Sequence, residues 1–169
     1  MLRFFILTIC FLFSVETFSQ TQKSSEDCLA IVGIFSNPQI IKGIKAYLYQ
    51  DEDIVDSATV DTNKDFGFIL KRNRHYTVQI AKDGFYPRRV SIVTDLPDKV
   101  KATPLFIFEF EIKLLRQLKG VDDFYMDFPI ALIAYDKKID KFLYSKKYTL
   151  NMQDKLKKTE EEFKVRKSH

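Results

Sequence analysis

The chain has 169 residues, of which 46% are hydrophobic and 14% aromatic, enough for one domain with a hydrophobic core. Its formal net charge is +4, from 27 basic and 23 acidic residues. That small excess comes with no recognisable nucleic-acid-binding motif, so composition and charge argue against a nucleic-acid partner.

The first segment, residues 1–20, has the pattern of a cleavable secretory signal peptide. Arg3 gives a short positive start, residues 4–15 are almost wholly apolar, and a more polar stretch follows. A membrane anchor is the alternative, but a spanning helix needs about 20 apolar residues and this run is shorter. We therefore expect a periplasmic or secreted protein that has no transmembrane span after cleavage near Ser19 or Gln20.

Cleavage would leave Cys28 as the only cysteine, so the mature chain could form no internal disulfide. A lipoprotein is disfavoured, because Ile9 precedes Cys10 and Asp27 precedes Cys28, where a small residue is expected. Two interpretations of Cys28 remain, a reactive or intermolecular thiol and a small buried side chain at the start of a strand. We favour the buried side chain.

After a flexible polar leader over residues 21–28, short apolar segments alternate with turn residues from 29 to 115. In the clearest segments every second residue is apolar, which places those side chains on one face of a strand. These positions are Phe66, Phe68 and Leu70; Tyr76, Val78 and Ile80; Val90 and Ile92; and Phe106, Phe108, Phe110, Ile112 and Leu114. Short strands at regular spacing predict a mainly β fold, a single antiparallel β-sandwich over residues 29–115.

One predicted strand, residues 44–49, presents two tyrosines on its outward face. Ala46 and Leu48 share the inward face, which leaves Tyr47 and Tyr49 on the other. An exposed tyrosine pair could stack on a sugar ring, so both are candidate partner-binding residues. The alternative, which we favour, is an ordinary half-buried strand surface.

Residues 116–150 are predicted to be a β extension of the sandwich. The apolar run 128–135 contains Pro129, which cannot donate to a ladder, so this run is an edge strand or the start of one. Residues 141–148 alternate loosely and are expected to pair with it. The many lysines from Lys137 onward form either a solvated surface or a contact to an acidic partner or anionic lipid.

Residues 151–169 are predicted to be a C-terminal helical tail, with Asn151 as the N-cap of a helix that ends at Arg166. Its apolar stripe is narrow and its other faces are densely charged. An isolated helix of this length is marginal in water, so it must pack on its own sandwich or on a partner. The charge balance slightly favours a partner, and the candidate partner-binding residues are Met152, Leu156 and Phe163.

Residues 42–94 resemble a known family. The runs KAYLYQDEDIVDSATVDTNKDFGFIL and HYTVQIAKDGFYPRRVSIVT are similar to the carboxypeptidase-regulatory-like, transthyretin-like β-sandwich domains. The residues at matching places are Asp61, Phe66, Phe68, Tyr76, Val78, Ile80, Lys82, Gly84 and Phe85. Val60 and Lys64 depart from the threonine and glycine that are usual there.

The segment FPIALIAYDKKIDKFLYSKKYT is similar to one that follows this domain in envelope proteins of Bacteroidota. The resemblance implies a β-sandwich that serves as a structural, interaction or carbohydrate-facing module, and it carries little information about activity. The transthyretin-like hydrolases of that group depend on several histidines and a distinctive C-terminal motif, and this chain has neither.

Chemistry-bearing residues are sparse. The histidines are His75 and the terminal His169, and neither accompanies a cysteine cluster or a nucleophile motif. Residues 61–65 have the Asp-x-Asn-x-Asp spacing of a calcium loop, but Phe66 stands where that loop requires glycine. Two solvated β-turns are the alternative for these acids, and we favour it. We predict no catalytic, cofactor-binding or metal-binding residues and therefore no enzyme.

These observations predict an exported, non-catalytic β-sandwich module that binds or assembles with another protein of the cell envelope. A carbohydrate-binding module that faces glycans is the alternative.

The first testable prediction concerns export. N-terminal sequencing of the protein from the producing cell's envelope or medium should begin near Thr21, because the signal is cut after the polar stretch. A product that retains Met1, or one that carries lipid on Cys28, would contradict export in soluble form.

Overall fold

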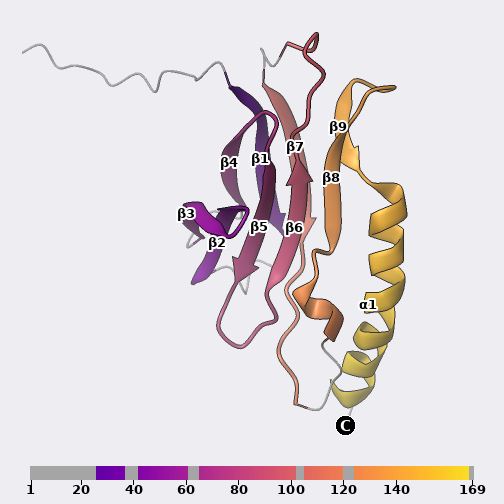
Figure 1. Cartoon of the computed structure of the whole chain (residues 1–169). Coiled ribbons are helices and arrows are strands. Elements are labelled where there is room, and N and C mark those ends of the chain that lie inside the picture. The colour runs from indigo at the N-terminus through magenta and orange to yellow at the C-terminus, as the bar shows by residue number, and fades with distance from the viewer. Residues whose placement is uncertain (1–25, 37–41, 61–64, 102–104, 120–123, 168–169) are drawn as a thin grey trace, which may run out of the picture.

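The computed structural model describes residues 26–36, 42–60, 65–101, 105–119 and 124–167, without the side chains at positions 158, 160, 162, 163, 166 and 167. The chain is mainly β with one C-terminal helix (Figure 1). Its elements in order are β1 (Asp27–Phe35), β2 (Ile44–Gln50), β3 (Asp53–Val60), β4 (Asp65–Lys71), β5 (His75–Ala81), β6 (Arg88–Val93), β7 (Phe106–Ile112), the 3-10 helix η2 (Phe124–Asp127), β8 (Ala131–Asp136), β9 (Lys141–Tyr144) and α1 (Lys146–Lys167).

The strands form two sheets of unequal width. The smaller sheet has the order β4-β1-β7, and the larger has the order β3-β2-β5-β6-β8-β9. Most pairings are antiparallel, as predicted, but β1 pairs with β7 and β6 pairs with β8 in parallel. A purely antiparallel fold was therefore the wrong prediction. The chain leaves β6, runs through β7 in the other sheet and returns to β8, and such a crossover brings the two strands into parallel pairing.

Inward-facing side chains of both sheets meet in one hydrophobic core, as in a sandwich-like arrangement. The predicted alternation holds in β4 and β5, where Phe66, Phe68 and Leu70 and then Tyr76, Val78 and Ile80 are buried between more exposed neighbours. In β7 the same face holds Phe110 and Ile112, but Phe108 is only half buried and stacks edge-on against Tyr144 at 5.1 Å between ring centroids.

The ring of Phe66 lies at the centre of the aromatic packing. It contacts Phe35, Phe68 and Phe110 at centroid distances of 5.9, 5.6 and 6.2 Å. Directly opposite, Gly33 of β1 leaves room for this ring, because a Cβ at that position would collide with Phe66 and come within 2.8 Å of Ile112 Cδ1. Glycine is therefore required there by close packing of β1 against the aromatic ring.

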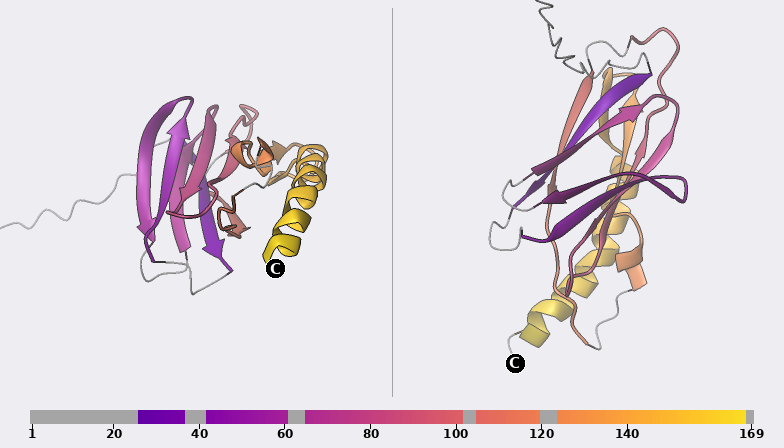
Figure 2. Two further views of the ribbon diagram at one scale, coloured as in Figure 1. Left: turned by 90° about the horizontal axis from the view of Figure 1, so that it is seen from below. Right: turned by 90° about the vertical axis from the view of Figure 1, so that its left-hand side faces the viewer.

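The helix α1 covers the part of the large sheet that extends past the small one. It packs on β8 and η2, at the end of the large sheet away from β3 (Figures 1 and 2). Met152 and Leu156 are buried on its inner side, and Leu156 joins Tyr86 and Met126 in a second hydrophobic cluster. The hydroxyl of Tyr148 donates a hydrogen bond to the carbonyl of Pro129 at 2.9 Å, which ties the first turn of the helix to the chain before β8.

Two predicted boundaries were wrong. The helix begins at Lys146 rather than after Asn151, and its first turn closes where Thr149 N donates to Ser145 O at 2.9 Å. Asn151 therefore lies inside the helix, because packing of Tyr148 and Met152 extends it beyond the local signal. At the other end of the chain, Asp27 and Cys28 belong to β1 rather than to a flexible leader.

The strand β8 also differs from its prediction, because it is an inner strand between β6 and β9. Pro129 precedes β8, so its missing N–H removes no hydrogen bond from the ladder. The strand β9 pairs with β8 over Lys141–Tyr144, as expected. Within the ranges that the structure describes, no helix has the length and apolar character needed to cross a membrane.

The core makes a stability prediction. Phe68→Ala should lower the free energy of unfolding by about 3–5 kcal/mol, because it removes a buried ring and leaves a cavity. Ile69→Ala is the matched control: Ile69 is the next residue of β4 and is 57% exposed, so its loss should cost about 1 kcal/mol or less. Equal midpoints for the two variants in urea would mean that the strand faces are assigned wrongly.

Candidate binding groove

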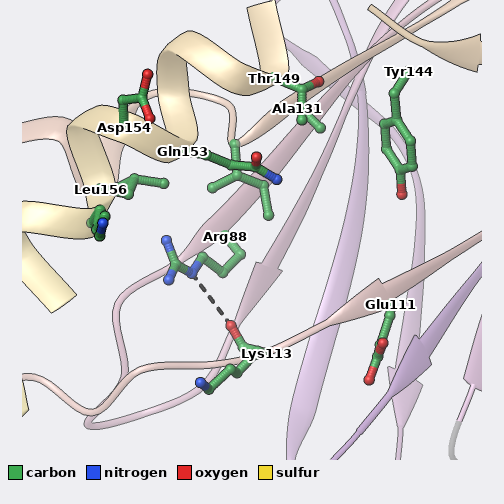
Figure 3. A pocket seen from close by; sticks show the side chains of 11 residues that line it. Arg88, Glu111, Lys113, Ala131, Tyr144, Thr149, Gln153, Asp154 and Leu156 are labelled. Carbon is green, nitrogen blue, oxygen red and sulfur yellow. Dashed lines mark hydrogen bonds between the residues drawn. The ribbon is translucent and has the colours of Figure 1, made fainter. Parts of the chain in front are cut away.

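The unequal widths of the sheets leave a groove between β7 and α1. The small sheet ends at β7, whereas the large one continues through β8 and β9, and α1 packs on β8. The groove has a volume of about 670 Å³, within the roughly 300–1,000 Å³ typical of ligand clefts. Its lining, drawn in Figure 3, consists of Arg88, Glu111, Lys113, Ile130, Ala131, Tyr144, Thr149, Gln153, Asp154, Leu156 and Lys157.

Arg88 lies in the floor of the groove. It is the first residue of β6 and shares the inward face with Val90 and Ile92, so it is only 4% exposed. Its Nε donates to the carbonyl of Lys113 at 3.4 Å (dashed in Figure 3), and one terminal nitrogen lies 3.3 Å from the sulfur of Met126. A buried guanidinium is stable only with such partners, so Arg88 links β6 to the chain after β7 and to η2.

The neighbouring Arg89 points to the opposite face of the sheet. Its Nε donates to Gln79 Oε1 at 2.7 Å, and its guanidinium pairs with the carboxylate of Asp127 at 3.4 Å. In the sequence the two arginines form an ordinary basic pair, and no motif or charge pattern distinguished Arg88 from its neighbour. Alternation along a strand places the two side chains on opposite faces of the sheet. The signal in the sequence that could have identified Arg88 was therefore its position on the inward face.

The helix contributes one wall of the groove. Thr149, Gln153, Leu156 and Lys157 recur at helical spacing, which places them on one side of α1. Gln153 and Lys157 are exposed, whereas Thr149 Oγ1 is buried and has no hydrogen-bond partner among the described residues. This wall therefore offers amide, hydroxyl and ammonium groups to an occupant.

The groove carries mixed charge with a cationic excess. Its cations are Arg88, Lys113 and Lys157, and its carboxylates are Glu111 and Asp154. Tyr144 and Glu111 lie to one side of Arg88, and Leu156 and Asp154 lie to the other (Figure 3). Burial raises the pKa of the Tyr144 hydroxyl, so this group stays protonated and able to donate at neutral pH. The lining residues include no histidine, cysteine or serine, and the chemistry that they offer is hydrogen bonding and charge pairing.

Two of the three predicted partner-binding residues of the helix, Met152 and Leu156, lie inside the protein. Met152 is 5% exposed and Leu156 is 7% exposed, so their stripe covers the chain's own β8 and η2 instead of presenting itself to a partner. Leu156 still borders the groove with its side chain. The side chain of Phe163 lies outside the described part of the chain. The sequence did not show that Met126 and Tyr86, far away along the chain, would meet this stripe.

Tyr47 and Tyr49 lie on the outward face of β2, as predicted, and are half buried. Their ring centroids are 6.5 Å apart and their planes are tilted by 57°, so they do not form one flat platform for a sugar ring. Tyr47 also borders a shallow cavity of about 360 Å³ beside Lys45 and Gln79. Neither tyrosine lines the groove between β7 and α1.

The remaining candidate residues are scattered. His75 is exposed at the start of β5, and residues 61–64 of the acidic loop lie outside the described residues. Among the positions that the structure does describe, no three His, Cys, Asp or Glu side chains gather as metal ligands would. Cys28 is fully buried in β1, as favoured from the sequence.

No protein-family model matches the chain, and a search of curated proteins returns no match.

The burial of Cys28 makes a reactivity prediction. Burial raises the pKa of its thiol to about 11, although the nearby Arg72 partly offsets this. Because thiolate is the reactive form, a thiol-specific disulfide reagent at pH 8 should modify the native chain about a hundredfold more slowly than a free cysteine. The same protein in guanidinium chloride should react at the ordinary rate. Rapid labelling of the native chain would contradict the burial of Cys28.

Proposed function

We propose that this protein is an exported, non-catalytic binding module of the cell envelope, which holds a segment of a partner protein in the groove between β7 and α1. The observation that carries the proposal is the groove itself, which is walled by a strand edge and a helix and lined by polar and charged groups. The N-terminal pattern of residues 1–20 supports the export of the chain.

The residue chemistry supports binding over catalysis. The groove lining has no pair of nucleophile and base, and its polar groups are suited to hydrogen bonds and charge pairs. The mainly β architecture is compatible with the interaction modules that residues 42–94 resemble. The helix packs on its own protein, so the partner surface is assigned to the groove beside α1 rather than to the stripe of Met152 and Leu156.

A glycan-facing module is the competing function. It would use Tyr47 and Tyr49, which lie on the outer face of the large sheet and away from the groove. Because the two surfaces are separate, substitutions can distinguish them. The tilt between the tyrosine rings weighs against a stacking platform at this place.

The proposal predicts that filling the groove abolishes partner capture. Gln153 is exposed and lines the groove, so Gln153→Trp should occupy it at little cost in stability. Asn151→Trp is the matched control, because Asn151 is exposed on the same helix and does not line the groove. The measurement is affinity capture from envelope fractions with the full chain, followed by identification of the bound proteins.

Loss of one specific partner with Gln153→Trp, and its retention with Asn151→Trp, is the expected result. Equal capture by both variants would remove the groove from the function. Specific signals on a glycan array that disappear with Tyr47→Ala/Tyr49→Ala would favour the glycan-facing module instead.

A further inference from the structure

The outer edge of β7 is the starting point for a more specific inference, which rests on the binding function proposed for the groove. The small sheet has the order β4-β1-β7, so among the described residues β7 pairs with β1 and with no further strand. A strand at the edge of a sheet presents a row of main-chain N–H and C=O groups that can pair with another chain. In this protein that edge borders the groove, because Glu111 and Lys113 line it.

The hydrogen-bond partners of the main-chain groups in and after β7 show to which side of the strand each group points. The carbonyl of Ile112 accepts hydrogen bonds from the amide and the hydroxyl of Ser36, both at 3.5 Å, so it points toward the β1 side. The next carbonyl, that of Lys113, accepts from Arg88 on the groove side. Main-chain groups alternate sides along a strand, so Glu109 and Glu111 direct their N–H and C=O groups toward the open edge.

The helix limits what can pair with this edge. The strand β9 lies beside the first half of β7, where Phe106 and Phe108 contact Phe142 and Tyr144. Beyond Phe108, α1 stands across the groove from Glu111 and Lys113, so this part of the edge is open to one inserted strand and screened against a second sheet. The other edge strands of the described sheets, β4, β3 and β9, are each bound to a neighbouring strand, and each would have to carry that strand with it. A second copy of the chain is therefore a poor occupant, and a free extended segment such as a terminus or loop fits better.

The charged residues that line the groove indicate which kind of extended segment would bind there. Three cations, Arg88, Lys113 and Lys157, face the groove against two carboxylates, Glu111 and Asp154. In Figure 3 the guanidinium of Arg88 lies between the helix and the segment that holds Lys113. An acidic side chain on the segment would pair with Lys113 and Lys157, which line the groove and are exposed, whereas Arg88 is buried with its own partners.

We propose that an extended peptide segment of the partner, carrying an acidic side chain, adds to the free edge of β7 as a fourth strand of the small sheet. Main-chain hydrogen bonds to Glu109 and Glu111 hold the segment, and Gln153 and Thr149 of α1 flank it on the other side. The acidic side chain pairs with the cations around Arg88.

The test uses the full chain and a phage-displayed library of random twelve-residue peptides. Peptides that bind the wild-type chain and Asn151→Trp, but not Gln153→Trp, are synthesised with a fluorophore for anisotropy titrations. N-methylation of alternate residues should weaken binding about tenfold or more when the methyl groups face β7, and much less when they are shifted by one residue. Replacing the acidic residue by its amide, or Lys113 by Gln, should also weaken binding severalfold.

A second measurement reads the strand addition directly. Amide hydrogen exchange should slow at Glu109 and Glu111 when the peptide is bound. Phe110 should not change, because its main-chain groups already face β1. This comparison within one strand separates pairing with the edge from a general stabilisation of the protein.

The outcomes distinguish the two proposals. Peptides that depend on the groove but show neither the alternation in N-methyl effects nor the protection of Glu109 and Glu111 would overturn strand addition and leave the groove as a binding site. A library that enriches no groove-dependent peptide would also overturn strand addition. If, in addition, Gln153→Trp leaves the capture of envelope proteins unchanged, the proposed function fails as well.

Discussion

The two sheets differ in width, and the hydrophobic surface that this difference leaves uncovered determines how the rest of the chain is arranged. Three strands cannot cover the inner face of six, so part of the inner side of β8 is left uncovered by the small sheet. Buried Ala131 and Ile133 lie on that inner side and must be kept from water. Next to β7, the contacts of Phe106 with Phe142 and of Phe108 with Tyr144 keep water from the hydrophobic surface. Farther from β7, α1 covers that surface by packing on β8.

The helix depends on that surface as much as the surface depends on the helix. Its apolar stripe is narrow and its sequence is rich in charge, so a helix of this composition would be marginal alone in water. Burial of Met152 and packing of Leu156 in the second hydrophobic cluster supply the missing stabilisation. The contact between Lys155 and the ring of Tyr125, 5.2 Å from its centroid, adds a cation–π interaction on the outside of the same contact.

The groove follows from the same geometry. A helix is wider than a strand and does not pair with a sheet edge, so α1 cannot seal against β7 as another strand would. The space between them contains the buried Arg88, whose bonds to Lys113 and Met126 hold the floor together. A strand edge on one side, a polar helix face on the other and a cationic floor between them support the binding of an extended, acidic segment.

The sequence by itself determined the mainly β class, the C-terminal helix and the inward faces of β4, β5 and β6. These features are local, because apolar side chains at every second position mark a buried strand face whatever lies opposite. It also indicated that Cys28 is buried, and that Tyr47 and Tyr49 share the outward face of β2.

Only the tertiary structure decided which strands are neighbours, where the helix packs and where the groove lies. Alternation assigns a face but names no partner, so the parallel pairings of β1 with β7 and of β6 with β8 left no local signal. The helix stripe has the same pattern whether it covers its own sheet or another protein. Arg88 and Lys113 are 25 positions apart, and their contact exists because β6 and the chain after β7 belong to opposite sheets that face each other across the core.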